Sequence, residues 1–223
     1  MLGDNLLFID AEAMVLDKPA GLGVTAGRDG KLSLENYLDS LRFGFVRHPT
    51  AVHRLDRDTT GCLLLARNPK AHKRYSAAFE AGEVEKLYLA VLEGVPAEEA
   101  GIVDLALGKT STREAGWRIV PDAKKGKAAR TRWQTLAVAG GRALVAFRPE
   151  TGRTHQIRVH AASGIGLPIR GDAVYGRAGA GMLLHARGLT VPRGAKLPIV
   201  AKSPLPPGFI TAGFGDETVD ATA

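Results

Sequence analysis

The chain has 223 residues, of which 45% are hydrophobic and 24% charged, so it is long enough and apolar enough to bury a sizeable core. Lys and Arg total 30 against 23 acidic residues, and the net charge of +7 favours a polyanionic partner, although charge alone does not establish one. No stretch approaches the ~20 apolar residues of a membrane span, and the N-terminus lacks the basic start of a signal peptide. The single cysteine, Cys62, excludes an intrachain disulfide and a multi-cysteine zinc site, so a cytoplasmic location is expected.

Local patterns predict an alternation of short strands and helices. Asn68 and Pro69 form a good N-cap and first-turn pair, and Gly82 can end the helix that follows. The Gly140-Gly141 pair is typical of a tight turn between two strands. The predicted elements, in chain order, are strands over 6–9 and 14–16, a helix over 33–41, a strand over 62–66, a helix over 69–81, and strands over 84–92, 128–138 and 142–148.

A polar cluster, His53 to Asp58, precedes the apolar run at 62–66 and is therefore expected on a loop that enters a buried strand. Asp56 lies between arginines, and their positive charge favours its ionised form, so it is expected to be an anion at neutral pH. A positioned carboxylate can act as a nucleophile. The same pattern also fits an aspartate that only caps a turn at the strand entry.

A second cluster, TGRTHQIRVH, occupies residues 151–160. Thr154 is a plausible N-cap for a short helix that runs to about Ala162 and is ended by Gly164, with Arg158 one turn inside it. Taken alone, two arginines and two histidines in ten residues also fit a solvated basic face.

Together these stretches resemble the two catalytic motifs of the RluA-type RNA pseudouridine synthases, HRLDRDTTGCLLLAR at 53–67 and GRTHQIRVH at 152–160. Thr60 stands where the family usually has serine, and Arg170 stands at a position that is commonly apolar. Further similar segments are LLFIDAEAMVLDKPAGL at 6–22, the K-x-Y-x-A pattern at 86–90, GKAARTRW at 126–133, LPIRGDAVYG at 167–176 and MLLHARGL at 182–189.

The resemblance implies an isomerase that detaches uracil from its ribose and rejoins it through carbon, in ribosomal or transfer RNA, without metal or organic cofactor. It implies an α+β fold with a mixed, mostly antiparallel central sheet flanked by helices. Asp56 would be the nucleophile and Arg158 its ion-pair partner, with Tyr88 beside them, while Arg54 would fill the gap left by an extruded uridine. The residues expected to contact RNA are His53, Arg54, Arg153 and His155.

We expect one catalytic domain over residues 1–212, acting as a monomer, followed by a disordered acidic tail at 213–223. Family members often carry an RNA-binding S4 domain before the catalytic domain, and only a handful of residues precede it here, so no S4 domain is expected. Two other functions remain open on the residues alone. One is a hydrolase that pairs Asp56 with Asp58 or Glu85, and the other is an RNA-binding module without catalysis.

Overall fold

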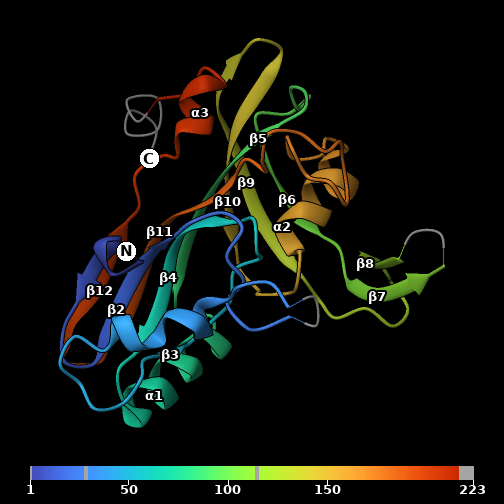
Figure 1. Ribbon diagram of the computed structural model, residues 1–223. Coiled ribbons are helices and arrows are strands. Elements are labelled where there is room, and N and C mark those ends of the chain that lie inside the picture. The colour runs from blue at the N-terminus through green and yellow to red at the C-terminus, as the bar shows by residue number, and fades with distance from the viewer. Residues whose placement is uncertain (1, 28–29, 114–115, 216–223) are drawn as a thin grey trace. The chain divides into compact units, whose positions relative to one another are not determined.

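The computed structural model describes residues 2–27, 30–113 and 116–215 (Figure 1). The chain forms two compact units. Unit 1 comprises Met1–Lys86 and Ala186–Pro204, and unit 2 comprises Leu87–His185 and Leu205–Ala223. Two of the three boundaries fall inside strands β5 (Glu85–Leu92) and β11 (Leu184–Arg193), and the third lies between Pro204 and Leu205, before helix α3 (Pro207–Thr211). The single domain over residues 1–212 stays a prediction.

Unit 1 is built on a sheet with the strand order β1-β2-β4-β11-β12. Antiparallel pairing joins β1 to β2, β2 to β4, and β11 to β12, and the short β3 pairs antiparallel with β4. Its elements other than β11 are η1 (Leu2–Asp4), β1 (Leu6–Ile9), β2 (Ala13–Lys18), the 3-10 helix η2 (Leu34–Leu41), β3 (Thr50–Ala51), β4 (Thr60–Ala66), α1 (Pro69–Glu80) and β12 (Lys196–Lys202).

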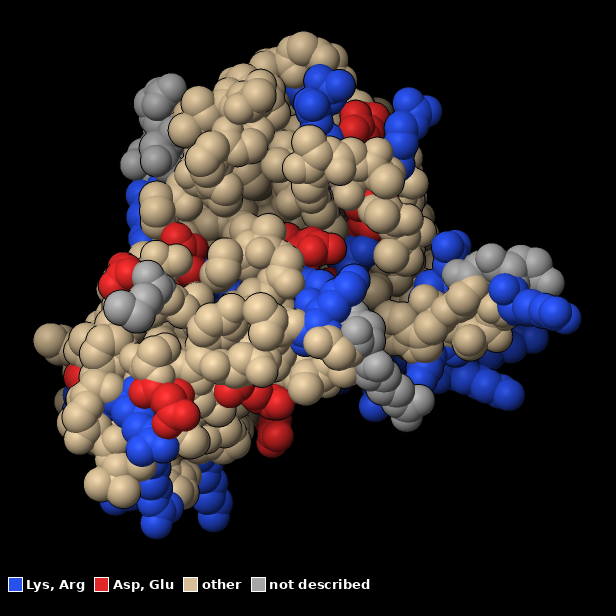
Figure 2. All heavy atoms as spheres, viewed as in Figure 1, with Lys and Arg blue, Asp and Glu red and all other residues tan. Residues whose placement is uncertain are grey.

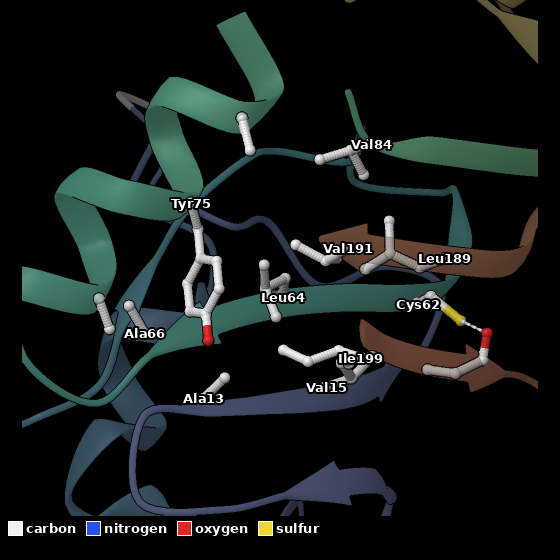
Figure 3. Packing of buried hydrophobic residues seen from close by; sticks show 13 residues of the cluster. Ala13, Val15, Cys62, Leu64, Ala66, Tyr75, Val84, Leu189, Val191 and Ile199 are labelled. Carbon is white, nitrogen blue, oxygen red and sulfur yellow. Dashed lines mark hydrogen bonds between the residues drawn. The ribbon is translucent and has the colours of Figure 1, made fainter. Parts of the chain in front are cut away.

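The core of unit 1 lies between α1 and its sheet (Figure 3). Strand β4 is buried from Gly61 to Ala66, as a near-continuous apolar run predicts. Helix α1 begins where the sequence predicts, because the side chain of Asn68 accepts a hydrogen bond from the amide of Ala71 at 2.9 Å. The helix then packs Tyr75, which is 0% exposed, against Leu64 of β4.

Unit 2 contains strands in the order β5-β10-β9-β6, all paired antiparallel, and a separate antiparallel hairpin of β7 and β8. The predicted turn between β9 and β10 is present, with positive φ at Gly140 (56°) and Gly141 (72°). The elements other than β5 are β6 (Ala100–Asp104), β7 (Leu107–Thr112), β8 (Gly116–Pro121), β9 (Arg130–Ala139), β10 (Arg142–Pro149), α2 (Gln156–Val159), the π-helix η3 (His160–Ile165) and α3 (Pro207–Thr211). The α+β class with a mostly antiparallel sheet is confirmed.

The helix after residue 154 differs from the prediction at both ends. Its N-cap is His155, not Thr154, and His155 has left-handed backbone geometry with φ of 54°. The helix passes from α2 into the π-helix η3 and ends at Gly166, whose φ is 84°. Gly164 serves packing instead of termination, because a Cβ atom there would lie 2.4 Å from Cγ1 of Val103.

The predicted start of the tail is also wrong. Phe214 is 1% exposed and packs with Phe209 of α3 and Leu205 in a second core of unit 2. An aromatic side chain this well buried is part of the fold, so the folded part of unit 2 extends at least to Phe214. The rest of the predicted tail, 216–223, lies outside the described residues.

Candidate active site

The loop that carries Asp56 is anchored by burial of its neighbour. Leu55 is 4% exposed, whereas Arg54 is exposed and Asp56 is half-buried. The amide of Thr59 donates to the carbonyl oxygen of Asp56 at 3.1 Å, which closes a turn before β4 begins. The turn and the buried leucine together fix the direction in which the chain enters β4.

His53 fastens the start of this loop to β4. Its Nε2 atom accepts a hydrogen bond of 2.9 Å from the amide of Leu64, so the ring is neutral and carries its proton on Nδ1. The ring also stacks on Phe79, with centroids 4.5 Å apart. Burial, aided by the charge of Lys86, lowers the pKa of His53 to about 3. His53 therefore holds the loop as a neutral group, and the RNA contact predicted for it stays a prediction.

Lys18 fastens the other side of the loop. The side chain is 0% exposed, and its Nζ atom donates to the carbonyl oxygens of Pro19 (2.9 Å), Leu22 (2.8 Å) and Arg57 (2.8 Å). Burial lowers the pKa of Lys18 to about 8, although the negative charges of Asp58 and Asp56 oppose that change. Lys18 thus positions the backbone next to Asp56.

Gly61 sets how closely β4 approaches β11. Its φ is 102°, and a Cβ atom there would lie 2.3 Å from the carbonyl oxygen of Ala186. Only glycine combines this backbone angle with so close an approach.

In unit 2 the predicted catalytic Arg158 is buried and forms an ion pair with Asp172. Its Nε and Nη2 atoms donate to the two carboxylate oxygens of Asp172, each at 2.7 Å. Burial would raise the pKa of Asp172, but the hydrogen bonds and charge of Arg158 and the amides of Val174 and Tyr175 outweigh burial and hold that pKa below its usual value. Asp172 is therefore a carboxylate that fixes the arginine in one orientation.

An aromatic cluster continues from this ion pair. The hydroxyl oxygen of Tyr175 accepts from the amide of Ile119 at 3.0 Å and lies 2.8 Å from Nδ1 of His155. The ring of Tyr175 lies beside the guanidinium of Arg158, and the His155 ring meets Trp117 edge to face at 5.2 Å. Trp117 is 42% exposed, so the cluster reaches from a buried arginine to the surface of the β7–β8 hairpin.

Gln156 fixes the loop that precedes α2. Its Oε1 atom accepts from the hydroxyl of Thr151 (2.8 Å) and the amide of Arg153 (2.9 Å). Its Nε2 atom donates to the carbonyl of Arg130 (3.0 Å) and the hydroxyl of Thr131 (2.9 Å). This buried amide is fully hydrogen-bonded, so the backbone conformation that presents His155 is rigid.

The predicted site residues divide between the units. Asp56, His53 and Arg54 belong to unit 1, whereas Tyr88, Arg153, His155 and Arg158 belong to unit 2. Within unit 2 the structure brings Arg158 and His155 together through Tyr175. The predicted contact between Asp56 and Arg158 stays a prediction. Tyr88 is half-buried on β5, where it pairs with Phe147 of β10.

Sequence reasoning missed Lys18 in unit 1, and Asp172, Tyr175 and Trp117 in unit 2. A lysine that ends an apolar run is the signal that could have indicated Lys18.

Among residues 2–27, 30–113 and 116–215, no group of three or more His, Cys, Asp or Glu side chains is placed to hold a metal ion. Within the same ranges, no helix has both the length and the apolar character of a membrane span.

The fold is similar to solved structures of human pseudouridylate synthases. It matches human RNA pseudouridylate synthase domain containing 4 with a TM-score of 0.78 and 27% identity, over 94% of this chain and 91% of that one. It matches human RNA pseudouridylate synthase domain containing 1 with a TM-score of 0.74 and 29% identity, over 90% and 82% of the two chains. Fold and site together therefore define the class as pseudouridine synthases.

The sequence comparisons narrow this class to a family. The family model for RNA pseudouridylate synthase matches residues 12–163. An uncharacterized RNA pseudouridine synthase of Zymomonas mobilis is 61% identical over 96% of this chain and 99% of its own length. Ribosomal large subunit pseudouridine synthase D of the same organism is 36% identical over 78% of this chain and 56% of its own length. The chain belongs to the RluA-type RNA pseudouridylate synthase family, and it is an isomerase that converts uridine to pseudouridine in RNA.

Proposed function

We propose that this chain modifies uridine in structured ribosomal or transfer RNA, with the Asp56 carboxylate as nucleophile. The observation that carries the proposal is the way in which the Asp56 loop is held. Leu55 is buried beside it, and the buried Lys18 donates to the carbonyl of Arg57, the next residue. A nucleophile needs such fixed geometry, because misplacement by about 1 Å can cost 10²-fold in rate.

The reaction requires no oxidant, reductant or water molecule as reactant. The Asp56 carboxylate attacks either the ribose or the uracil ring, and both routes give the same isomer. The bond from C1′ of ribose to N1 of uracil breaks, a bond from C1′ to C5 forms, a proton leaves C5, and N1 gains a proton. We place Arg158 and Tyr88 beside Asp56. Asp172 occupies the Nε side of the Arg158 guanidinium, so Asp56 would approach the opposite edge.

A uridine within structured RNA must leave its stack before a carboxylate can reach it, at a cost of a few kcal/mol. Arg54 is exposed on the same loop as Asp56, and we propose that it fills the space that the uridine leaves. Arg153 and His155 come from the second motif and would contact phosphates or bases. Of these two, Arg153 is exposed and donates through Nε to the carbonyl of Ala128 at 3.0 Å.

The β7–β8 hairpin supports an RNA partner. Basic side chains gather over this hairpin, at the right of Figure 2. Trp117 lies exposed on β8, and Nζ of Lys109 on β7 is 5.8 Å from its ring centroid. Many proteins bind single-stranded RNA by stacking its bases on exposed aromatic rings that lie beside basic side chains. We propose that the hairpin holds RNA next to His155.

We also propose that the enzyme acts as a monomer in the cytoplasm, where a free thiol such as Cys62 stays reduced.

The proposal is tested by Asp56→Asn, with Asp58→Asn as the matched control on the same loop. Transcripts of ribosomal and transfer RNA are incubated with each protein, and isomerised uridine and released base are both measured. Asp56→Asn should bind RNA as the wild type does and make no pseudouridine, whereas Asp58→Asn should retain turnover. Turnover near wild type in Asp56→Asn contradicts the assignment, and release of free uracil supports a hydrolase with two carboxylates instead.

A further inference from the structure

Unit 2 contains a pocket of about 870 Å³, large enough for a nucleotide-sized ligand. It is lined by Glu93 directly after β5, Arg142 at the start of β10, parts of the segment 168–183, and residues of α3 and just after it; the strands and α3 are labelled in Figure 1. The residues that line it do not include Arg158, Asp172, Tyr175 or His155. The pocket is thus distinct from the ion pair and the aromatic cluster described above.

The wall of the pocket is fixed to β5. The amide of Glu93 donates to the carbonyl of Pro168 at 2.9 Å, and the amide of Arg170 donates to the carbonyl of Val91 at 2.8 Å. At the other end of the segment, the amide of Val91 donates to the carbonyl of Leu183 at 3.1 Å. These bonds tie both ends of the segment 168–183 to strand β5.

The charges at the pocket do not balance. Three arginines and one glutamate line it, and the glutamate, Glu93, pairs with Nε of Arg142 at 3.2 Å. The guanidinium groups of Arg170 and Arg177 make no hydrogen bond or ion pair with any of the residues that the structure describes. Arg170 is half-buried, which makes an unpaired charge there unfavourable. An anion bound by two hydrogen bonds per guanidinium would compensate both arginines.

Glycines leave the backbone of the pocket open to a ligand. A Cβ atom at Gly181 would meet nothing within 4 Å, and one at Gly179 would meet only Cα of Gly171 at 3.7 Å. The backbone is therefore within reach of a phosphate oxygen. Leu183 and Pro168 add apolar surface, which suits a sugar or a base.

We propose that this pocket binds one nucleotide of the substrate RNA outside the target uridine, with Arg170 and Arg177 on its phosphate. The inference rests on the proposed function only in taking RNA as the ligand. A free nucleotide offers the same phosphate chemistry and must be distinguished by experiment. The nucleotide in this pocket would add affinity without touching the reacting atoms.

The test uses the full chain carrying both Arg170→Ala and Arg177→Ala. The matched control carries Lys70→Ala and Lys73→Ala, which remove two exposed charges from α1 in unit 1. Binding of a fluorescein-labelled oligouridine of about 12 nucleotides is followed by anisotropy over a salt series. The pocket variant should bind at least about fivefold more weakly than the control, with a log-log salt slope shallower by about 0.7 per lost phosphate contact. Arg170→Lys with Arg177→Lys should recover part of the affinity.

The binding data and two further measurements, thermal stabilisation and isomerisation, separate the outcomes. Equal affinity and equal salt slope in the pocket and control variants overturn the proposal. A second outcome is that uridine 5′-monophosphate raises the melting temperature of the wild type but not that of the pocket variant, while the pocket variant binds RNA as tightly as the control does. That combination would show that the pocket binds a free nucleotide, and it overturns RNA as the ligand. The single-turnover isomerisation rate at saturating RNA should be the same in wild type and pocket variant. If the wild type binds RNA through the pocket but makes no pseudouridine, the proposed function fails and this inference stands.

Discussion

Arg158 and Asp172 form a buried, two-point ion pair, with Nε and Nη2 of the arginine 2.7 Å from the two carboxylate oxygens. The side chain of Arg158 is 9% exposed and that of Asp172 is 0% exposed. The arginine of the second motif thus has a carboxylate partner only 14 residues away in sequence. A substitution at Arg158 therefore also disturbs Asp172, and its effect on stability cannot be assigned to Asp56 alone.

Asp172→Asn should destabilise the protein by about 3–5 kcal/mol, because Arg158 would remain desolvated without its counter-charge. The pKa of Asp172 in the folded chain lies below its unfolded value, so the ion pair contributes stability that is present above the unfolded value and lost as pH falls through the folded one. Urea unfolding at several pH values tests this. The gap between wild type and Asp172→Asn should be widest near neutral pH and shrink below about pH 4. A gap that does not change with pH contradicts the ion-pair account.

The predicted contact between Asp56 and Arg158 needs a double-mutant cycle of Asp56→Asn with Arg158→Lys. Arg158→Ala is unsuitable, because it leaves Asp172 buried without a cation. If the two side chains meet, their effects on unfolding free energy should be coupled by more than about 0.5 kcal/mol. Single-turnover isomerisation of the Arg158→Lys variant should be intermediate, because lysine keeps the charge but not the planar fork. Additive effects within that margin would show that the two residues do not share a site.

Lys18→Met should lower turnover by one to two orders of magnitude with little change in RNA affinity, because the carbonyl of Arg57 loses its donor and the Asp56 loop loosens. Lys18 has a pKa of about 8 against its usual 10.5, so between these values the unfolded chain holds a proton that the folded chain has released. Stability of the wild type relative to Lys18→Met should therefore rise with pH across this window, by up to about 3 kcal/mol. Equilibrium unfolding of both proteins measures it, and a flat difference would mean that Lys18 titrates normally.

Trp117→Ala should weaken binding of single-stranded RNA by about 1–3 kcal/mol, the usual value of one stacked base. The chain has 2 tryptophans, and the other, Trp133, is only 9% exposed. RNA should therefore quench mainly the fluorescence of Trp117. Quenching that persists unchanged in Trp117→Phe would exclude stacking on this ring.

Phe214→Ala should cost about 3–5 kcal/mol, because it opens a cavity against Phe209 and Leu205. Ile210→Ala on α3 is the control, since Ile210 is 61% exposed and its loss should cost less than about 0.5 kcal/mol. Thermal unfolding of both variants decides the matter. Equal stability of the two would mean that α3 and Phe214 do not form a core.

The sequence by itself determined those structural features that depend on only a few neighbouring residues. The Asn68-Pro69 pair correctly marks the start of α1, and Gly140-Gly141 correctly marks the turn between β9 and β10. The resemblance of the two motifs at 53–67 and 152–160 was enough to indicate the family. Such features are encoded locally, because a cap or a tight turn depends on the backbone preference of the residues that form it.

Contacts between distant residues were decided only by the tertiary structure. Nothing local to Lys18 predicts that its amine binds the carbonyl of Arg57, which is 39 residues away. Asp172 likewise becomes the partner of Arg158 only when the segment after the π-helix folds back. His155 adopts a left-handed backbone against local preference, in a loop that Gln156 fixes through four hydrogen bonds. The burial of Phe214 also depends on the position of α3, because packing energy comes from neighbours that the chain brings together only on folding.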